Sequence, residues 1–422
     1  MTTERSPGFV ISGGCSKFRP TTVIHKLRIV YNACSQTVPM VLVVPKLRIG
    51  YNVMKEIDIT FKTMFSELEQ RSLDASFATE FSTDGNFVKQ TSKERDFWYF
   101  QIRTDGVPHR KYVGPTSDEE ITKRVQAFKE IKNDLKSRRQ LVSTLTRTAR
   151  LPRPETFTGD VVEVLGNAGF FRLRGVLVGT VAFQCYSGLL GVKLPIIAMQ
   201  TGDADFAQFH CISAAVGDSM PPMLGLLKEL DGTFRETPYQ NDGRFTTQYE
   251  NAKRYKVEFL TPNRGSNELS GNASPMPALG GASAQPLRFL DFLIHEPIRT
   301  VLLHKSGVPV TIPAPERFAV HKMIVSTRRR NDASGYSKRD KDLLQAKALI
   351  EALIQTRREG DLAMVFSEAW NRGPAWKEAL TIARATFDAD AKEKFSEALR
   401  EGLDQIGESP AGYGFEKNGF KP

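Results

Sequence analysis

Three stretches of this sequence decide the fold: Leu177-Val-Gly-Thr180, Thr201-Gly-Asp-Ala-Asp-Phe-Ala207 and Tyr255-Lys-Val-Glu-Phe-Leu260. Each is an apolar or alternating run of the kind that forms a strand. Successive side chains of a strand point to opposite faces, so Asp203 and Asp205 share one face, roughly 6.6 Å apart along the backbone. The intervening Ala204 and Phe206 then point into the core.

Two carboxylates that close together predict a bound cation. Like charges at that separation repel each other or raise one pKa, and a metal ion removes the conflict. Mg²⁺ prefers oxygen ligands and usually joins a few protein carboxylates to substrate phosphates. Glu258, on the third stretch, completes a set of three and has the chemistry to accept the proton of an attacking hydroxyl. The alternative interpretation is that the aspartates after Gly202 are turn or capping residues.

Gly179 and Thr180 predict a phosphate-binding turn. A glycine at the end of a strand lets the backbone approach a phosphate closely, and the following helix, Val181 to Leu190, offers unpaired N–H groups. The Thr180 hydroxyl adds a donor for a phosphate oxygen.

These motifs resemble the nucleotidyltransferase-fold proteins related to DNA polymerase β and the minimal nucleotidyltransferases. Their pattern is a hydrophobic residue with Gly-Ser/Thr, then Asp-x-Asp, then a lone carboxylate on a strand. The chain is similar to one uncharacterised bacterial branch over roughly residues 90 to 380. The strings that carry this likeness are Phe171-Arg-Leu-Arg-Gly-Val-Leu-Val-Gly-Thr180, Phe259-Leu-Thr-Pro262, Pro286-Leu-Arg-Phe-Leu290, Pro313-Ala-Pro-Glu-Arg-Phe-Ala-Val-His-Lys322 and Lys341-Asp-Leu-Leu-Gln-Ala346.

The resemblance implies that Asp203 and Asp205 bind metal ions, that Glu258 is the third carboxylate, and that Gly179 and Thr180 hold the triphosphate. The chain departs from the family pattern in two respects. Thr180 and Asp203 are 23 positions apart, which is longer than in minimal members, and threonine replaces the commoner serine. The departure bears on the Thr180 contact more than on the carboxylates.

Further candidates for nucleotide binding lie downstream. Arg317 and His321 share a face of a predicted helix at i and i+4, with Lys322 beside them, so a positive cluster is expected there. Resemblance to toxin-type nucleotidyltransferases implies that Lys322 and Asp342 shape the substrate pocket. The stretch Lys338-Arg-Asp-Lys-Asp342 is equally typical of an exposed, charged helix start.

The net charge of the chain is +10, and residues 1–150 hold 25 Lys and Arg against 16 Asp and Glu. Such an excess attracts phosphate-rich partners, including RNA, although a solvated basic surface has the same composition. Four cysteines without a CxxC pair predict neither a zinc site nor disulfides. The longest apolar run near the N-terminus is too short to span a bilayer, so we expect a cytoplasmic protein with no membrane partner.

The fold class expected is α+β, a nucleotidyltransferase-fold mixed β-sheet domain with helical N-terminal and C-terminal regions. Residues 1–53 are a poorly patterned extension, and the functional protein is expected to begin near Met54. Helical spacing in residues 54–80, a hairpin over 97–113 turning at Thr104-Asp-Gly106, and a helix capped at Ser117 and running to Arg139 make residues 54–150 a helix–hairpin–helix region.

The catalytic domain is expected at 151–314, with strands at 176–178, 194–206 and 255–260 and a surface loop over 265–285. Residues 315–422 form a helical domain, with helices over 316–329, 337–357, 362–371 and 375–403.

The activity predicted is Mg²⁺-dependent transfer of a nucleoside monophosphate from an NTP to an acceptor hydroxyl or phosphate, on RNA or tRNA, a protein or a small molecule. A toxin-like role would add an antitoxin-like protein partner. The alternative is a catalytically inactive nucleotide- or RNA-binding module of a toxin–antitoxin or defence system. The two differ in whether labelled nucleotide is transferred.

Overall fold

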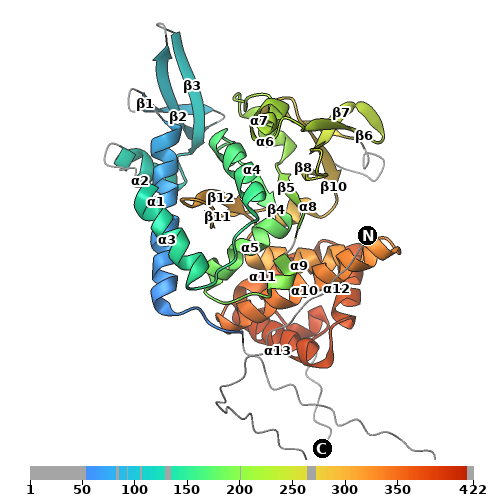
Figure 1. Ribbon diagram of the computed structural model, residues 1–422. Coiled ribbons are helices and arrows are strands. Elements are labelled where there is room, and N and C mark those ends of the chain that lie inside the picture. The colour runs from blue at the N-terminus through green and yellow to red at the C-terminus, as the bar shows by residue number, and fades with distance from the viewer. Residues whose placement is uncertain are drawn as a thin grey trace, which may run out of the picture. The chain divides into compact units, whose positions relative to one another are not determined.

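The computed structural model describes residues 54–81, 85–92, 94–104, 107–128, 135–199, 201–263 and 272–415. They belong to the compact unit Val53–Pro422 (Figure 1). The predicted extension, residues 1–53, lies outside the described residues, and the boundaries of the predicted regions at 150/151 and 314/315 remain predictions.

The N-terminal part of this unit combines three helices with a three-stranded antiparallel sheet. Its elements are α1 (Ile59–Glu80), β1 (Asn86–Ser92), β2 (Arg95–Thr104), β3 (Val107–Pro115), α2 (Glu119–Ala127) and α3 (Leu135–Arg147). Strands β2 and β3 confirm the predicted hairpin, whose turn residues 105 and 106 lie outside the described residues. The expected single helix from Ser117 to Arg139 is wrong. Asp118 caps α2 by accepting from the N–H of Ile121 at 3.0 Å, and α3 is a separate helix.

The central part holds a seven-stranded mixed sheet. Its elements are α4 (Thr156–Asn167), β4 (Val176–Val178), α5 (Gly179–Leu190), η2 (Ile196–Met199), β5 (Asp203–Ala207), α6 (His210–Ala215), α7 (Met223–Leu230), β6 (Arg235–Tyr239), β7 (Asp242–Glu250), β8 (Lys256–Pro262), β9 (Ser274–Pro275), η4 (Pro277–Leu279), β10 (Ser283–Leu287), α8 (Leu290–Leu293), β11 (Ile298–Leu302) and β12 (Val308–Ile312). The strand order is β4-β5-β8-β10-β9, and the β6–β7 hairpin joins β8 through β7. Strands β5 and β8 lie side by side and parallel at the centre.

The apolar face of this sheet explains its stability. Phe206 of β5 and Phe259 of β8 are register partners with stacked rings 5.9 Å apart, and Phe170 packs edge-on against Phe206 at 5.1 Å. All three side chains are buried. Burying an aromatic side chain of this size contributes roughly 2 kcal/mol or more each. The alternation in β5 therefore leaves the aspartates on the opposite face, as the sequence predicts.

Two central predictions are wrong. Residues 194–206 are not one extended segment, because the 3-10 helix η2 precedes β5. Residues 265–285 are not only a surface loop. Residues 264–271 lie outside the described residues, but β10 pairs in parallel with β8, and Met276 and Leu279 beside it are buried. Small residues such as Ala282 and Ala284 fill this close-packed edge.

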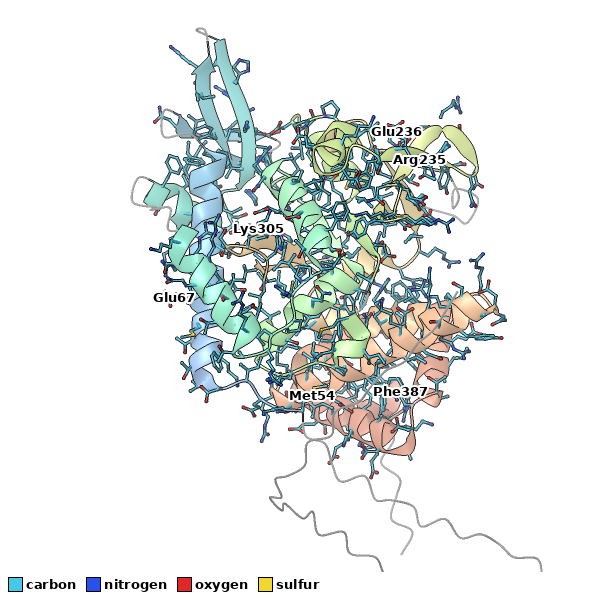
Figure 2. The ribbon with its side chains drawn as sticks, viewed as in Figure 1. Met54, Glu67, Arg235, Glu236, Lys305 and Phe387 are labelled. Carbon is cyan, nitrogen blue, oxygen red and sulfur yellow. The ribbon has the colours of Figure 1, made fainter. Side chains whose placement is uncertain are left out.

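The C-terminal part is helical, as predicted, with α9 (Pro315–Ser326), α10 (Ala333–Gln355), α11 (Glu359–Asn371), α12 (Pro374–Ala385), α13 (Ala389–Gln405) and the short η5 (Pro410–Tyr413). The expected helix over 375–403 is instead two helices, because Asp388 caps α13 by accepting from the N–H of Ala391. Met54 lies among these helices (Figure 2), where its carbonyl accepts from Gln355 Nε2 at 2.9 Å. With its mixed sheet and flanking helices, the protein has the α+β fold predicted.

Among the described residues, the helices are all too short or too polar to cross a bilayer.

Candidate active site

Three carboxylates meet on one face of the two central strands. Asp203 and Asp205 lie at alternate positions of β5, and Glu258 of β8 is the register partner of Asp205. Register partners on neighbouring strands project to the same face of a sheet. All three side chains are partly buried, and Thr201 donates a hydrogen bond to the Asp203 carboxylate. The structure therefore brings the predicted acidic triad together.

The electrostatics of the triad are those of crowded negative charge. Burial, together with the charges of Asp203 and Glu258, raises the pKa of Asp205 to about 7. Burial and Asp203 also raise the pKa of Glu258. Lys338 opposes both shifts, and Lys322 opposes the shift of Asp205. Without a cation, this group of carboxylates resists full ionisation near neutral pH.

Gly179 lies against the Asp205 carboxylate. It begins α5 with φ +67, a conformation that favours glycine, and a Cβ atom built there would lie 2.3 Å from Asp205 Oδ2. The glycine thus makes room for the carboxylate itself, a role that the sequence did not indicate. Thr180 follows in the first turn of α5 and is buried. Gly179 therefore lies beside the triad, and the phosphate contacts of Gly179 and Thr180 remain predictions.

Lys322 of α9 forms an ion pair with the buried Asp342 of α10. Lys322 Nζ lies 2.6 Å from Asp342 Oδ1, and Arg329 Nε lies 2.7 Å from Asp342 Oδ2. Burial acts to raise the pKa of Asp342, but the two cations hold it below its usual value. The structure links the predicted Lys322 and Asp342 to each other, and Lys322 acts electrostatically on Asp205.

Arg317 is not brought to the triad. Its guanidinium lies 2.8 Å from Glu368 Oε2 and packs over the Phe292 ring at 5.1 Å. Burial and the nearby Lys322 lower the pKa of His321 to about 3, so its imidazole is neutral near pH 7. The positive cluster expected from Arg317, His321 and Lys322 is therefore not assembled, and Lys322 alone of the three bears on the carboxylates.

A family model for nucleotidyltransferases matches residues 156–371, more than half of the chain. The chain belongs to this nucleotidyltransferase family. The matched segment runs from the start of α4 to the end of α11 and contains the whole acidic triad. No curated protein and no solved structure was found to match the chain.

Two lysines of the nucleotidyltransferase segment were missed as site residues in the sequence. Lys338 acts on Asp205 and Glu258, and Lys341 is influenced by Asp203 and Asp205. Burial and then Lys322 lower the pKa of Lys341. Their i, i+3 spacing puts Lys338 and Lys341 on one face of α10, and this spacing is the feature of the sequence that could have indicated them. Only the packing of α10 distinguishes that face from an ordinary solvated one.

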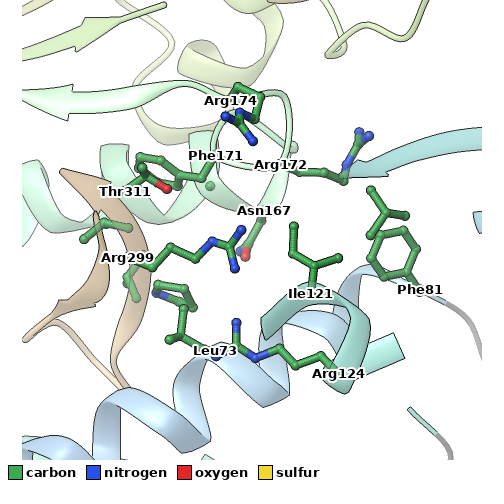
Figure 3. A pocket seen from close by; sticks show the side chains of 15 residues that line it. Leu73, Phe81, Ile121, Arg124, Asn167, Phe171, Arg172, Arg174, Arg299 and Thr311 are labelled. Carbon is green, nitrogen blue, oxygen red and sulfur yellow. The ribbon is translucent and has the colours of Figure 1, made fainter. Parts of the chain in front are cut away.

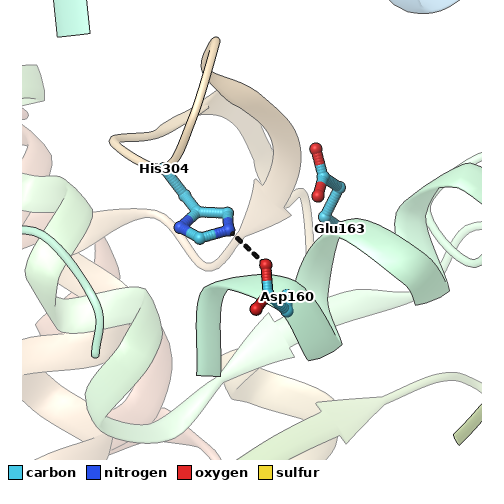
Figure 4. A group of neighbouring side chains, drawn as sticks. All are labelled: Asp160, Glu163 and His304. Carbon is cyan, nitrogen blue, oxygen red and sulfur yellow. Dashed lines mark hydrogen bonds and ion pairs between the residues drawn. The ribbon is translucent and has the colours of Figure 1, made fainter. Parts of the chain in front are cut away.

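A second acidic group in the nucleotidyltransferase segment has the composition of a metal site. Asp160 and Glu163 of α4 approach His304, which lies between β11 and β12 (Figure 4), with His304 Nε2 2.9 Å from Asp160 Oδ1. Lys305 (Figure 2) already lies 2.7 Å from Asp160 and 2.6 Å from Glu163. Because its ammonium pairs with both carboxylates, we interpret the group as an ion-pair network that joins α4 to the β11–β12 hairpin.

Proposed function

We propose that this chain transfers a nucleoside monophosphate from an NTP to an acceptor hydroxyl or phosphate, with magnesium held by Asp203, Asp205 and Glu258. The observation that carries the proposal is the arrangement of these carboxylates on one face of adjacent parallel strands, beside the glycine that begins α5. Membership of the nucleotidyltransferase family supports NMP transfer in general.

The donor set fits Mg²⁺. It consists of carboxylate oxygens, the ligands that this ion prefers, and the mutual repulsion that raises the pKa of Asp205 and Glu258 is relieved by a bound cation. When bound, magnesium neutralises the triphosphate and polarises the phosphoryl oxygens. We assign magnesium to the triad and not to Asp160, Glu163 and His304, because Lys305 already pairs with both carboxylates of that group.

The protein's own groups then divide the remaining work. The raised pKa of Glu258 makes its carboxylate a stronger base, which favours its accepting the proton of the attacking hydroxyl. Lys338 and Lys341 place positive charge beside the carboxylates, where the phosphates of the NTP would lie. Gly179 and Thr180 offer the backbone and hydroxyl of the first turn of α5 to the triphosphate. Asp342 orients Lys322 towards this region through its ion pair.

Incubation with each of the four α-³²P-labelled NTPs, Mg²⁺ and total cell RNA or lysate tests the proposal. We expect label on an acceptor with the wild-type chain, and none with a metal chelator or with Asp203→Ala or Asp205→Ala. The label's position distinguishes RNA, protein and small-molecule acceptors. Transfer that survives both substitutions would overturn the site. Nucleotide binding without any transfer would favour the inactive module, acting through a partner such as an antitoxin-like protein.

Lys338 is expected to contribute to NTP binding. Lys338→Ala should raise the KM for NTP about tenfold, equivalent to about 1.4 kcal/mol, with a smaller effect on kcat. The physical reason is the loss of one exposed positive charge facing the phosphates. Steady-state kinetics at several salt concentrations measure the change in KM. Added salt screens an exposed charge, so the difference in KM between Lys338→Ala and wild type should become smaller.

Arg339→Ala is the matched control, because Arg339 is the next residue of α10 and its guanidinium packs over Tyr336 instead. Equal KM values for the two variants would remove Lys338 from the site.

A further inference from the structure

A cavity of about 770 Å³ opens next to the acidic triad. Thr201 lines the cavity and donates a hydrogen bond to the Asp203 carboxylate. Thr158 also lines it and accepts a hydrogen bond from the hydroxyl of Tyr255, which directly precedes β8. Its other walls come from α5, from the segment between α3 and α4, and from the residues that follow α5. Its volume lies in the range of ligand-binding pockets.

The lining of this cavity carries uncompensated positive charge. Four cationic side chains line it: Lys55, Arg150, Arg153 and Lys193. Within the described part of the chain, these four form no ion pair, and Glu155 is the one acidic residue in the lining. An anionic ligand is the partner that this charge would attract.

In a second cavity, most of the lining arginines are paired with carboxylates. It measures about 100 Å³ and is lined by four arginines (Figure 3). Arg124 is paired with Asp74 and Glu120, and Arg299 lies 2.8 Å from Asp118. Arg172 lies 2.6 Å from Asp218. Carboxylates thus compensate three of the four arginines, and the Arg299 pair joins the β11–β12 hairpin to the N-terminal elements. The fourth, Arg174, is exposed to solvent.

The four cations of the larger cavity are distinct from the lysines that act on the triad. The lysines that shift the pKa of Asp205 or Glu258 are Lys322, Lys338 and Lys256, and the cavity's cations are not among them. Asp203, Asp205 and Glu258 are not among the residues that line the cavity, so its cations face a space beside the metal site. That position suits phosphates that lie farther along a bound acceptor.

The chain segment that supplies Arg150 and Arg153 is basic along its length. Residues 135–154 contain six Lys and Arg and no acidic residue. On α3, Lys136, Arg139 and Arg147 are exposed and, within the described residues, without an ion-pair partner. They precede Arg150 and Arg153 in the chain. Several exposed cations in one segment suit a chain of phosphates better than a single phosphate group.

The cavity also offers groups that a nucleotide can use. Ile196 in its lining is 77% exposed, an apolar surface for the face of a base. Gln184, only 7% exposed, donates through Nε2 to the Met199 carbonyl at 2.9 Å. Its buried Oε1 accepts no hydrogen bond from the described residues. A hydroxyl or amino donor of the ligand would satisfy it.

We infer that this cavity receives the end of a single-stranded nucleic acid, whose terminal hydroxyl is the acceptor. The inference rests on the proposed function. In the reaction, the hydroxyl oxygen forms a bond to the α-phosphorus of the NTP while the bond from that phosphorus to the bridging oxygen breaks. Pyrophosphate leaves, and the hydroxyl proton passes to Glu258. Lys55, Arg150, Arg153 and Lys193 hold the backbone phosphates behind the terminal nucleotide.

Fluorescence anisotropy with a labelled, random-sequence single-stranded RNA of about 20 nucleotides tests the site on the full chain. The variant is Arg150→Glu with Arg153→Glu. We expect its affinity to fall at least about tenfold, and the slope of log affinity against log salt to become about 1.4 units shallower as two phosphate contacts are lost. Binding of a fluorescent ATP analogue should not change.

The matched control is Arg357→Glu with Lys228→Glu, which makes the same change in net charge. Arg357 is exposed with φ +58, close to the φ +55 of Arg150, and Lys228 is exposed on α7. Circular dichroism confirms the fold of both double variants, and Arg153→Gln supplies a milder version of the test. Equal RNA affinity of the variant and its control would overturn the inference, as would transfer exclusively to protein or to a small molecule. If the wild type binds the RNA through these arginines but transfers nothing, the proposed reaction fails and the binding site stands.

Discussion

Replacement of Asp205 by asparagine is expected to reduce nucleotidyl transfer about 10³-fold while leaving the protein folded. Asparagine has nearly the same shape, so the packing beside Gly179 is kept, but it lacks the charge that holds a cation. Single-turnover measurement of label transfer at saturating NTP gives the rate of the chemical step. Asp404→Asn, an exposed aspartate of α13, is the control for loss of one carboxylate.

The same substitution has an opposite effect on stability. The pKa of Asp205 is about 7 in the folded protein, against an ordinary value of 3.8 for an aspartate. Since the folded state favours the protonated carboxyl, this group lowers the free energy of unfolding as pH rises from about 4 to about 7. The loss reaches roughly 4 kcal/mol at most above that range. Metal-free Asp205→Asn should therefore be more stable than wild type at pH 8 and nearly equal to it at pH 4.

Urea unfolding in the presence of a chelator at the two pH values measures this difference. Added Mg²⁺ should stabilise the wild type at pH 8 and have little effect on Asp205→Asn. A variant that keeps a tenth of wild-type transfer, or that gains no stability at pH 8, would show that Asp205 is not the crowded metal ligand proposed here.

Gly179→Ala is expected to reduce transfer about 10²-fold through displacement of a ligand. The new Cβ would lie 2.3 Å from Asp205 Oδ2, so the carboxylate must move away from the position in which it faces Asp203 and Glu258. The positive φ of this residue adds strain of about 1 kcal/mol. Kinetics and thermal unfolding of the same preparation separate the two effects.

Gly191→Ala is the control at the other end of the same helix. Gly191 has φ +68 against +67 for Gly179, so the backbone strain is matched. Its new Cβ would meet Lys62 Cε, in the flexible part of a half-buried side chain. Both variants should lose similar stability, and Gly179→Ala alone should lose transfer. If Gly191→Ala loses as much activity, the effect of Gly179 is backbone strain and not contact with Asp205.

The acidic triad was largely predictable because its cause is local. Alternation along β5 places Asp203 and Asp205 opposite Ala204 and Phe206, and this follows from strand geometry alone. That Glu258 lies next to Asp205 depends on the pairing of β5 with β8 across about fifty residues of chain. The spacing of residues contains no information about that register. The prediction that Glu258 is the third carboxylate therefore depended on the family resemblance and not on periodicity.

Other features depended on contacts between distant segments. Residues 274–287 have the small, polar and proline-rich composition of a loop, yet β10 forms because β8 offers it an unpaired edge. Arg317 has the sequence context of a phosphate ligand, but it forms an ion pair with Glu368 of α11 instead. In the sequence, Lys338 and Lys341 resemble the residues of any charged helix start. Only the packing of α10 beside the triad distinguishes them.

The sequence by itself determined the α+β class, the helical C-terminal part, and the strand that presents two aspartates, since these follow from hydrophobic period and residue type. The tertiary structure alone decided which charges face one another. It placed Gly179 against Asp205, joined Lys322 to Asp342, and surrounded one cavity with Lys55, Arg150, Arg153 and Lys193 from three separate segments. Pairing between distant charges is set by the packing of whole elements, which a local pattern does not encode.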